Sequence, residues 1–413
     1  RLLRDGDIVI EVSGGSAASG QHTGRSLLVT GEILQSLGGK VIPASFCRLL
    51  RLDTQQVHPG FVILQIDSLH RSGEIAEFEN QSTGIANFQF NRFVAETYPI
   101  IKELDAQKTI AEYVSSFDRL IALNRRINQT LEAMAQAIFK SWFVDFDPVK
   151  AKIAAIEQGE DPLRAAMRAI SGKTDAELDQ MPREHHDQLA ATAALFPDAM
   201  EESELGRIPR GWGIKKLGSV TDYLNRGISP KYLEDGGVLV LNQKCIRDFR
   251  VDESKGRRHD PSQRKIDGRT LEVGDVLVNS TGVGTLGRVA QVLHLSEPAI
   301  VDSHVTVVRA GGEINCSYLG CYINWMQPNI EAMGEGSTGQ TELSRLKLAE
   351  LPMLTPYKDV LKAFDALISP LTAEISEKER ESVKLAELRD SLLPKLLSGE
   401  LRVPDTERIV EKV

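Results

Sequence analysis

The chain carries the stretch LRDGDIVI at Leu3–Ile10 and a close copy of it, LEVGDVLV, at Leu271–Val278. In each copy a Gly-Asp pair leads into a run of β-branched and aliphatic residues, which is the composition of a strand. A second pair of strand-like stretches follows, at Val41–Arg51 and at Ala299–Arg309. These ordered matches indicate an internal repeat, and such a repeat decides how the whole chain is organised.

Two further landmarks keep the same order in both halves. Ser82-Thr83-Gly84 matches Ser337-Thr338-Gly339, and each copy continues to an arginine, Arg92 or Arg345, and then to a proline, Pro99 or Pro352. One match of this kind could arise by chance, but four matches in one order indicate duplication. We therefore predict two similar β-rich domains in one chain.

A long amphipathic helix is expected after each proline, because apolar residues recur there at alternating steps of three and four. The first seam comprises Ile110, Phe117, Leu120, Asn124, Ile127, Leu131, Met134 and Ile138, and the second comprises Leu361, Phe364, Ile368, Leu371, Ile375, Leu385, Leu388 and Leu392. Asn124 is the polar member that would fix the register of a partner helix. Ser369-Pro370 resembles a helix start, so we expect a break in the second helix there.

Each helix is the obvious partner of the other. One such helix alone would more simply lie on the core of its own domain, but two at equivalent places favour an antiparallel pair. The predicted fold class is α+β, with two β-rich α/β domains separated by two long helices packed as an antiparallel coiled coil. The predicted boundaries are a first head at 1–100, a first spacer helix at 101–147, a solvent-exposed helical connector at 148–205, a second head at 206–356, a second spacer helix at 357–400 and a tail at 401–413.

Composition predicts a soluble, cytoplasmic protein with no membrane contact. Four scattered cysteines without a CxxC pair suit a reducing compartment, and no apolar run has the length of a membrane helix. The net charge of −9 argues against a polyanionic partner for the chain as a whole. Residues 206–310 are the exception, with 17 Lys and Arg against 12 Asp and Glu, which allows a basic face on the second head.

Motifs for chemistry are missing. Gly282–Gly287 fits GxGxxG, but a strand rather than a helix follows it, so we interpret it as a hairpin and not as a dinucleotide site. No phosphate loop, HExxH or GxSxG motif is found, and the methyltransferase segment Asn/Asp-Pro-Pro-aromatic is absent too. His304 is expected to be a core or surface histidine, and the His185-His186 pair is weak evidence for a metal. The chain is predicted to be non-catalytic, with no metal and no cofactor of its own.

Three phrases of the sequence resemble the specificity subunits of type I restriction-modification enzymes. They are QTLEAMAQAIFKSWFVDF at Gln129–Phe146, SELGRIPRGW at Ser203–Trp212 and LLPKLLSGEL at Leu392–Leu401. The resemblance covers essentially the whole chain. It implies two target-recognition domains that each read half of a split DNA site, and two helices that hold them apart.

The same resemblance implies the partners. Double-stranded DNA, methyltransferase (modification) subunits and a restriction/translocase subunit would bind this chain. S-adenosylmethionine, ATP and Mg would be bound by those subunits, and the assembled complex would be a site-specific deoxyribonuclease and methyltransferase. Because the two heads differ in sequence, the DNA site should be asymmetric, with its halves about 34 Å apart.

Candidate DNA contacts are basic and polar residues in the predicted loops, where cations bind phosphate and amides or hydroxyls read base edges. In the second head they are Arg226, Lys231, Asn242, Gln243, Lys244, Arg247, Arg257, Arg258, Arg264, Lys265, Ser280, Thr281, Arg288 and Gln340. In the first head they are Ser13, Ser16, Gln21, Arg25, Gln81, Ser82, Thr83 and Asn87. About half are expected to be ordinary exposed loop residues.

The first copy differs from the second at its start. The second has some 60 residues, 211–270, ahead of its Gly-Asp strand, whereas the first begins almost at that strand, with Arg1. We expect the first head to lack its opening portion and to expose sheet edges that invite aggregation. Two other functions compete with DNA reading by a subunit: a self-contained nuclease or methyltransferase, and a coiled-coil adaptor that binds only proteins.

Overall fold

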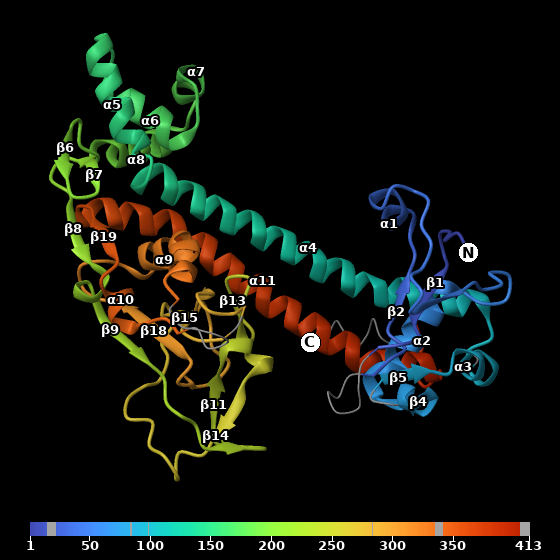
Figure 1. Ribbon diagram of the computed structural model, residues 1–413. Helices are drawn as coiled ribbons and strands as arrows, with labels where there is room; N and C mark the ends of the chain where they lie inside the picture. Colours follow the sequence, from blue (N-terminus) through green and yellow to red (C-terminus); the bar gives the residue numbers. More distant parts are fainter. Residues whose placement is uncertain (15–21, 83–84, 98, 283, 335–341, 405–413) are drawn as a thin grey trace. The chain divides into compact units, whose positions relative to one another are not determined.

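The computed structural model describes residues 1–413 except 15–21, 83–84, 98, 283, 335–341 and 405–413 (Figure 1). The chain forms two compact units. Unit 1 comprises 1–126 and 378–413, and unit 2 comprises 127–377. The long helices α4 (Leu104–Phe143) and α11 (Lys358–Ser398) each contribute to both units.

Unit 1 contains a three-stranded antiparallel sheet of order β2-β1-β3 and a β4-β5 hairpin. Its elements ahead of α4 are β1 (Ile8–Glu11), β2 (Ser26–Leu28), α1 (Gly31–Ser36), β3 (Cys47–Leu50), α2 (Pro59–Ser72), β4 (Glu79–Ser82), β5 (Ile85–Phe88) and α3 (Phe90–Glu96). Ile8 and Ile10 on β1 are fully buried against an aromatic group of Phe78, Phe88 and Phe93. Alternate residues of β1 therefore supply the core of this sheet.

Unit 2 contains two four-stranded sheets, β16-β15-β18-β9 and β10-β14-β11-β17. Its strands are β6 (Met200–Ser203), β7 (Gly206–Pro209), β8 (Gly213–Lys216), β9 (Thr221–Arg226), β10 (Tyr232–Leu233), β11 (Val238–Leu241), β12 (Ile246–Arg247), β13 (Arg250–Val251), β14 (Arg257–His259), β15 (Val276–Asn279), β16 (Val289–Gln291), β17 (Ala299–Val301), β18 (Val305–Ala310) and β19 (Pro352–Thr355). Helices α9 (Cys316–Ala332) and α10 (Arg345–Ala349) follow β18. The hairpin expected at Gly282–Gly287 is confirmed, because β15 and β16 pair antiparallel on either side of it.

The predicted repeat is confirmed in the backbone. In unit 1, Ile8 of β1 lies opposite Leu28 on one side and Leu50 on the other. In unit 2, Val276 of β15 lies opposite Gln291 and Val308. Strand order and register are therefore the same in the two copies.

The Gly-Asp landmark has a structural reason. Asp7 accepts two hydrogen bonds from Arg51, at 2.7 and 2.6 Å, and one from the backbone N–H of Arg4, at 2.7 Å. Asp275 accepts two from Arg309, both at 2.7 Å, and one from the backbone N–H of Glu272, at 2.8 Å. Both carboxylates are buried, and Arg51 holds the pKa of Asp7 below its ordinary value. We call these the two Asp-Arg clasps.

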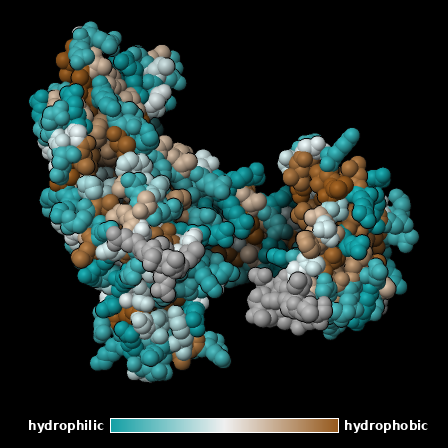
Figure 2. Space-filling model, viewed as in Figure 1, coloured by the Kyte–Doolittle hydropathy of each residue, from teal (hydrophilic) through white to brown (hydrophobic). Residues whose placement is uncertain are grey.

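The copies differ at one sheet edge. In unit 2, β9 pairs with the outer side of β18, whereas among the residues that the structure describes no strand pairs with the outer side of β3. Unit 1 also exposes Leu27, Leu37 and Phe46, and apolar surface gathers on this unit in Figure 2. The uncovered edge that we expected is present at β3, and aggregation through it stays a prediction.

The seam predicted for the first helix is only partly right. In unit 1, α4 packs antiparallel on α11, since Asp118 pairs with Arg389 and Asn124 donates to Ser382 at 3.3 Å. In unit 2, Asn128 donates to the carbonyl of Ile375 at 3.3 Å.

The buried positions of α4 include Ile110, Val114, Phe117, Ile121, Asn124, Asn128, Ala135 and Phe139. The predicted Leu120 and Met134 are exposed, while Ile127, Leu131 and Ile138 are half-buried. Two apolar stripes overlap on this helix. The buried stripe is the seam, and the prediction included Leu120 and Met134, which belong to the second, exposed stripe.

The seam predicted for the second helix is confirmed, but the predicted break is wrong. Leu361, Phe364, Ile368, Ile375 and Leu392 are buried, and Leu371, Leu385 and Leu388 are half-buried. Helix α11 continues through Pro370 to Ser398. Burial on both sides of the proline outweighs its missing N–H, and the hydroxyl of Thr372 bonds to the Ser369 carbonyl at 3.0 Å nearby.

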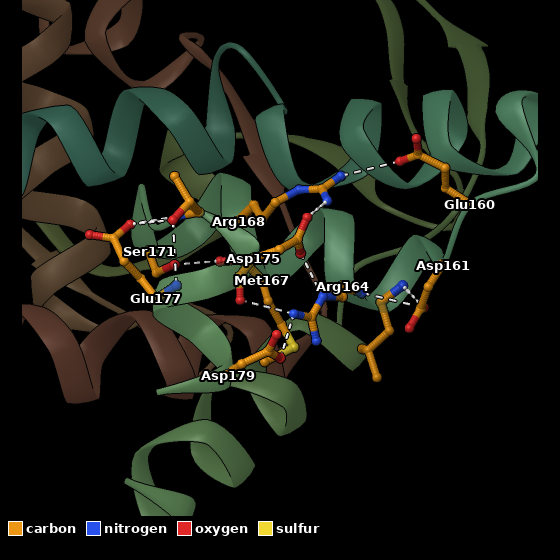
Figure 3. A network of polar contacts seen from close by, with 11 residues as sticks. Glu160, Asp161, Arg164, Met167, Arg168, Ser171, Asp175, Glu177 and Asp179 are labelled. Carbon is orange, nitrogen blue, oxygen red and sulfur yellow. Dashed lines mark hydrogen bonds and ion pairs between the residues drawn. The ribbon is translucent and has the colours of Figure 1, made fainter. Parts of the chain in front are cut away.

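The connector is more compact than expected. It consists of α5 (Asp147–Gln158), α6 (Pro162–Ser171), α7 (Asp175–Asp179) and α8 (Arg183–Ala194), with a small core that contains Met167 and Leu178. Arg164 and Arg168 on α6 both point toward Asp175 at the start of α7 and pair with it at 2.5 Å (Figure 3). The end of the expected helical range is a strand, β6. This segment is therefore a small folded part of unit 2.

Candidate nucleic-acid interface

A basic face lies around β10 and β14, and we define it as Lys231, Tyr232, Arg257, Arg264 and Lys265. Tyr232 lies opposite His259 in the β10-β14 pair. The guanidinium carbon of Arg257 stands 3.4 Å from the centroid of the Tyr232 ring. Stacking of this kind leaves an arginine charged and holds it in one orientation.

Buried His259 organises this face. Its Nε2–H donates to the carbonyl of Arg264 at 2.8 Å, so its Nδ1 is the acceptor for the backbone N–H of Lys231 at 3.0 Å. Arg264 in turn donates to the carbonyl of Ser229 at 3.1 Å. The segment that carries Arg264 and Lys265 is thus tied to the segment that carries Lys231.

The cations of the basic face are free of carboxylates. No ion pair joins Lys231, Arg257, Arg264 or Lys265 to a carboxylate of the residues that the structure describes. The neighbouring Arg258 contrasts with them, because it makes two hydrogen bonds to Glu297, at 2.7 and 2.8 Å, and lowers the pKa of that carboxyl. Cations without a carboxylate partner remain available to phosphate, whereas Arg258 is neutralised by Glu297.

Three side chains from separate elements meet at one end of the sheet that contains β15 and β18. We call Gln243, Thr281 and His304 the sheet-end cluster. The amide of Gln243 donates to the Thr281 hydroxyl, and Thr281 Oγ1 lies 2.8 Å from Nδ1 of His304. A cluster of amide, hydroxyl and imidazole groups can exchange hydrogen bonds with base edges.

Other candidates from this region are engaged within the protein. Ser280 is fully buried with its hydroxyl 2.5 Å from that of Thr306, so proposing it as a base contact was wrong. Arg226 pairs with Glu342 at 2.6 Å and donates to the carbonyl of Leu343. Asn242 caps a short helix by accepting from the N–H of Lys244, and Arg288 donates to the carbonyl of Gly284.

The remaining candidates are scattered. Lys244 and Arg247 are exposed, and Arg247 lies 3.5 Å from Asp248. In the first head, Arg25 pairs with Glu11 at 2.8 Å, and Ser13 and Asn87 form an isolated bridge. Gln81 and Ser82 belong to β4. Ser16, Gln21, Thr83 and Gln340 lie outside the described residues, as do part of the first Ser-Thr-Gly landmark and the whole of the second.

Two residues of the interface were missed from the sequence. Tyr232 follows Lys231 in the basic part of the chain, so an aromatic residue beside a cation was the available signal. His304 was considered only as a core or surface residue and is exposed. Their partners Arg257 and Thr281 lie more than twenty residues away in the sequence, and no spacing rule connects them.

Within the described part of the chain, no group of three or more His, Cys, Asp or Glu side chains is arranged to hold a metal ion. None of the described helices combines the length and apolar character that crossing a bilayer requires.

Two relatives match most of this chain. The type I restriction enzyme HindI specificity subunit of Haemophilus influenzae is 30% identical over 325 residues, and the match covers 73% of this chain and 68% of that protein. The type I restriction enzyme MjaIX specificity subunit of Methanocaldococcus jannaschii is 22% identical, and the match covers 75% of this chain and 61% of that protein. The solved S subunit of a type I restriction-modification system from M. genitalium has a TM-score of 0.46 at 15% identity, over 96% of this chain and 84% of that chain. No protein-family model matches the sequence.

Proposed function

We propose a DNA-reading role for this chain from one established premise: the chain belongs to the family of type I restriction enzyme specificity subunits. Each head reads one half of a two-part DNA site. Because the heads differ in sequence, the two halves differ and the site is asymmetric. The residues of the second head described above support this role most directly.

The basic face is the observation that carries the proposal. Its cations have no carboxylate partners among the described residues, and they are preorganised by Tyr232 and His259. A cation that is already oriented and has no carboxylate partner replaces a counterion on DNA without first breaking an ion pair. The overall charge of −9 does not oppose this binding, because affinity depends on the face presented to the duplex.

We expect Arg257→Ala to weaken binding of the assembled complex to duplex DNA. The loss should be similar for all sequences, because a phosphate contact carries no sequence information. The slope of log affinity against log salt concentration should become shallower by about one. Fluorescence anisotropy across a salt series measures both quantities.

Lys216→Ala is the matched control for Arg257→Ala. It removes one exposed positive charge from β8, where Lys216 pairs with Glu350 at 2.5 Å. The control should leave affinity and slope unchanged. Equal behaviour of the two variants would remove the basic face from the interface, and the absence of any duplex binding by the wild-type complex would favour a protein-only adaptor.

Partner subunits are proposed to dock on the long helices. The second apolar stripe of α4 exposes Leu120 in unit 1 and Met134 in unit 2, and α11 exposes Leu367 in unit 2. Large apolar side chains left in water on helices are common at protein interfaces. We propose that methyltransferase subunits bind these helices and that a restriction/translocase subunit completes the complex.

The Met134→Glu variant tests this docking. Met134 is 47% exposed, so we expect the free energy of unfolding to stay within about 0.5 kcal/mol of the wild-type value. A charge placed in an apolar interface should weaken binding of the methyltransferase subunit by at least roughly tenfold. Co-purification and titration with that subunit measure the effect. The control Ala133→Glu adds the same charge at the neighbouring exposed position, and identical results for both variants would argue against a specific docking stripe.

The proposed roles of the subunits follow from this arrangement. The chain itself is proposed to bind and position DNA without catalysing a reaction. S-adenosylmethionine for methyl transfer, and ATP with Mg for restriction, are assigned to the partner subunits. We propose that the complex acts in the cytoplasm.

A further inference from the structure

The sheet-end cluster contains one side chain that is both fixed and directed outward. The backbone N–H of His304 donates to the buried Asp302 carboxylate at 2.9 Å, and the His304 carbonyl accepts from the N–H of Ser280 at 2.8 Å. Both backbone groups are thus bonded to the sheet. The imidazole nevertheless remains exposed.

One ring nitrogen of His304 is bonded within the cluster. The Thr281 hydroxyl accepts from the Gln243 amide, and in the arrangement where it donates its own proton to Nδ1 of His304, that nitrogen is the acceptor. A neutral imidazole that accepts at Nδ1 carries its own proton on Nε2. No described residue bonds to Nε2. In this tautomer the ring presents an oriented N–H donor to the outside.

One backbone bridge connects the segment before His304 to the segment that leads to the basic face. Ile228 forms a bridge with Asp302, two residues before His304, and Lys231 and Tyr232 follow Ile228 by three and four residues. Three or four residues of fully extended chain span about 10–15 Å, so Lys231 and Tyr232 lie no further than that from the bridge at Ile228. That separation spans about three to four base pairs of DNA. Phosphates held by the basic face would place the base edges within reach of the cluster.

Resting on the proposed function, we infer that His304 is a specificity-determining residue of the second head, in which its Nε2–H donates to an acceptor on a base edge. Purine N7 is the acceptor of first choice, because it lies open in the major groove. Thr281 and Gln243 act through His304 as positioning residues. Arg226 does not supply this donor, because it is already bonded to Glu342 and to the Leu343 carbonyl.

The experiment maps methylated positions in the genome of a host that expresses the complete complex with either wild-type or variant chain. The wild type should give a two-part motif. His304→Ala should relax one base position in one half of that motif and leave the other half unchanged. In binding assays with duplexes altered at that position, discrimination should fall roughly tenfold to a hundredfold.

The positioning residues have their own variants. Thr281→Val keeps the shape of the side chain but removes the hydroxyl, and it should relax the same position to a smaller degree. Thr281→Ser restores the hydroxyl and should restore the wild-type motif. A purely structural role for Thr281 would change stability without changing that base position.

Several outcomes would overturn the inference. An unchanged motif with His304→Ala excludes His304 as a reader, although the proposed function would stand. If His304→Ala abolishes methylation, equal weakening of binding to every duplex in the panel also excludes it. A wild-type complex that methylates without sequence preference contradicts the proposed function itself, so the two failures are distinguishable.

Discussion

Replacing Arg309 by methionine is expected to destabilise unit 2 by about 3 kcal/mol, because it leaves the Asp275 carboxylate buried without its cation. The Asp275 side chain is 0% exposed and Arg309 contributes two of its hydrogen bonds. Methionine retains much of the side-chain volume, so the loss reports on the charge and its hydrogen bonds. A buried ion pair costs more to break than it contributes when intact.

Urea unfolding of the full chain measures this effect. Trp142, Trp212 and Trp325 all belong to unit 2, so tryptophan fluorescence follows the unfolding of that unit. Lys215→Met is the control, because its pair with Glu313 lies on the surface of the same unit and should contribute less than about 1 kcal/mol. Equal losses for the two variants would show that the second clasp is no more important than a surface ion pair.

Phe364→Ala is expected to cost about 3–5 kcal/mol, since it removes a large ring from a closed aromatic cluster. Phe364 is fully buried, with ring centroids of Phe143 and Trp142 at 5.0 and 5.9 Å. The cavity lies where α4 and α11 meet in unit 2. The same fluorescence titration measures the loss, and the emission of Trp142 should shift toward that of an exposed indole.

Leu367→Ala, one turn further along α11, is the control for this cavity. Leu367 is 43% exposed, so its truncation should change stability by no more than about 0.5 kcal/mol. The pair of variants therefore tests which face of α11 is the seam. A larger loss from Leu367→Ala than from Phe364→Ala would contradict the packing described for this unit.

The repeat and the second seam could be predicted because both are local signals. A Gly-Asp pair followed by β-branched residues is evident from the residues alone, and the apolar spacing of α11 is regular. On α4 two apolar stripes share members every seventh residue, and the sequence does not say whether Leu120 or Ile121 faces inward. Only the partner helix decides that. Pro370 was misjudged for a related reason, because burial of Phe364 and Ile368 outweighs a local helix-breaking signal.

The residues of the candidate interface were hard to predict from the sequence for a different reason. Charge composition drew attention to the second head, but it did not distinguish Arg257 from Arg258. One stacks on Tyr232 and the other is held by Glu297, and both partners are distant in sequence. Ser280 and Thr281 likewise point to opposite sides of the same chain, one into the core and one to the cluster. Loop residues whose contacts are non-local cannot be sorted by type alone.

The residues that carry the family resemblance are core residues. Trp142, Phe143 and Trp212 pack in one aromatic group, with Phe143 and Trp212 centroids 5.9 Å apart. Such residues report on how the chain folds and not on which bases it reads. These sequence segments therefore identify the family but do not predict the target DNA sequence.

Each of the two Asp-Arg clasps bonds the two ends of a chain segment to one another. The bonded residues are 44 positions apart in the first clasp and 34 in the second, so each clasp holds together the first and last residues of the segment between them. The chain between those ends can gain, lose or exchange loop residues without disturbing the closure. In unit 2 the enclosed segment contains Thr281 and His304 but none of the basic face, so exchanging that segment alone would change base reading while the proposed phosphate contacts stay in place.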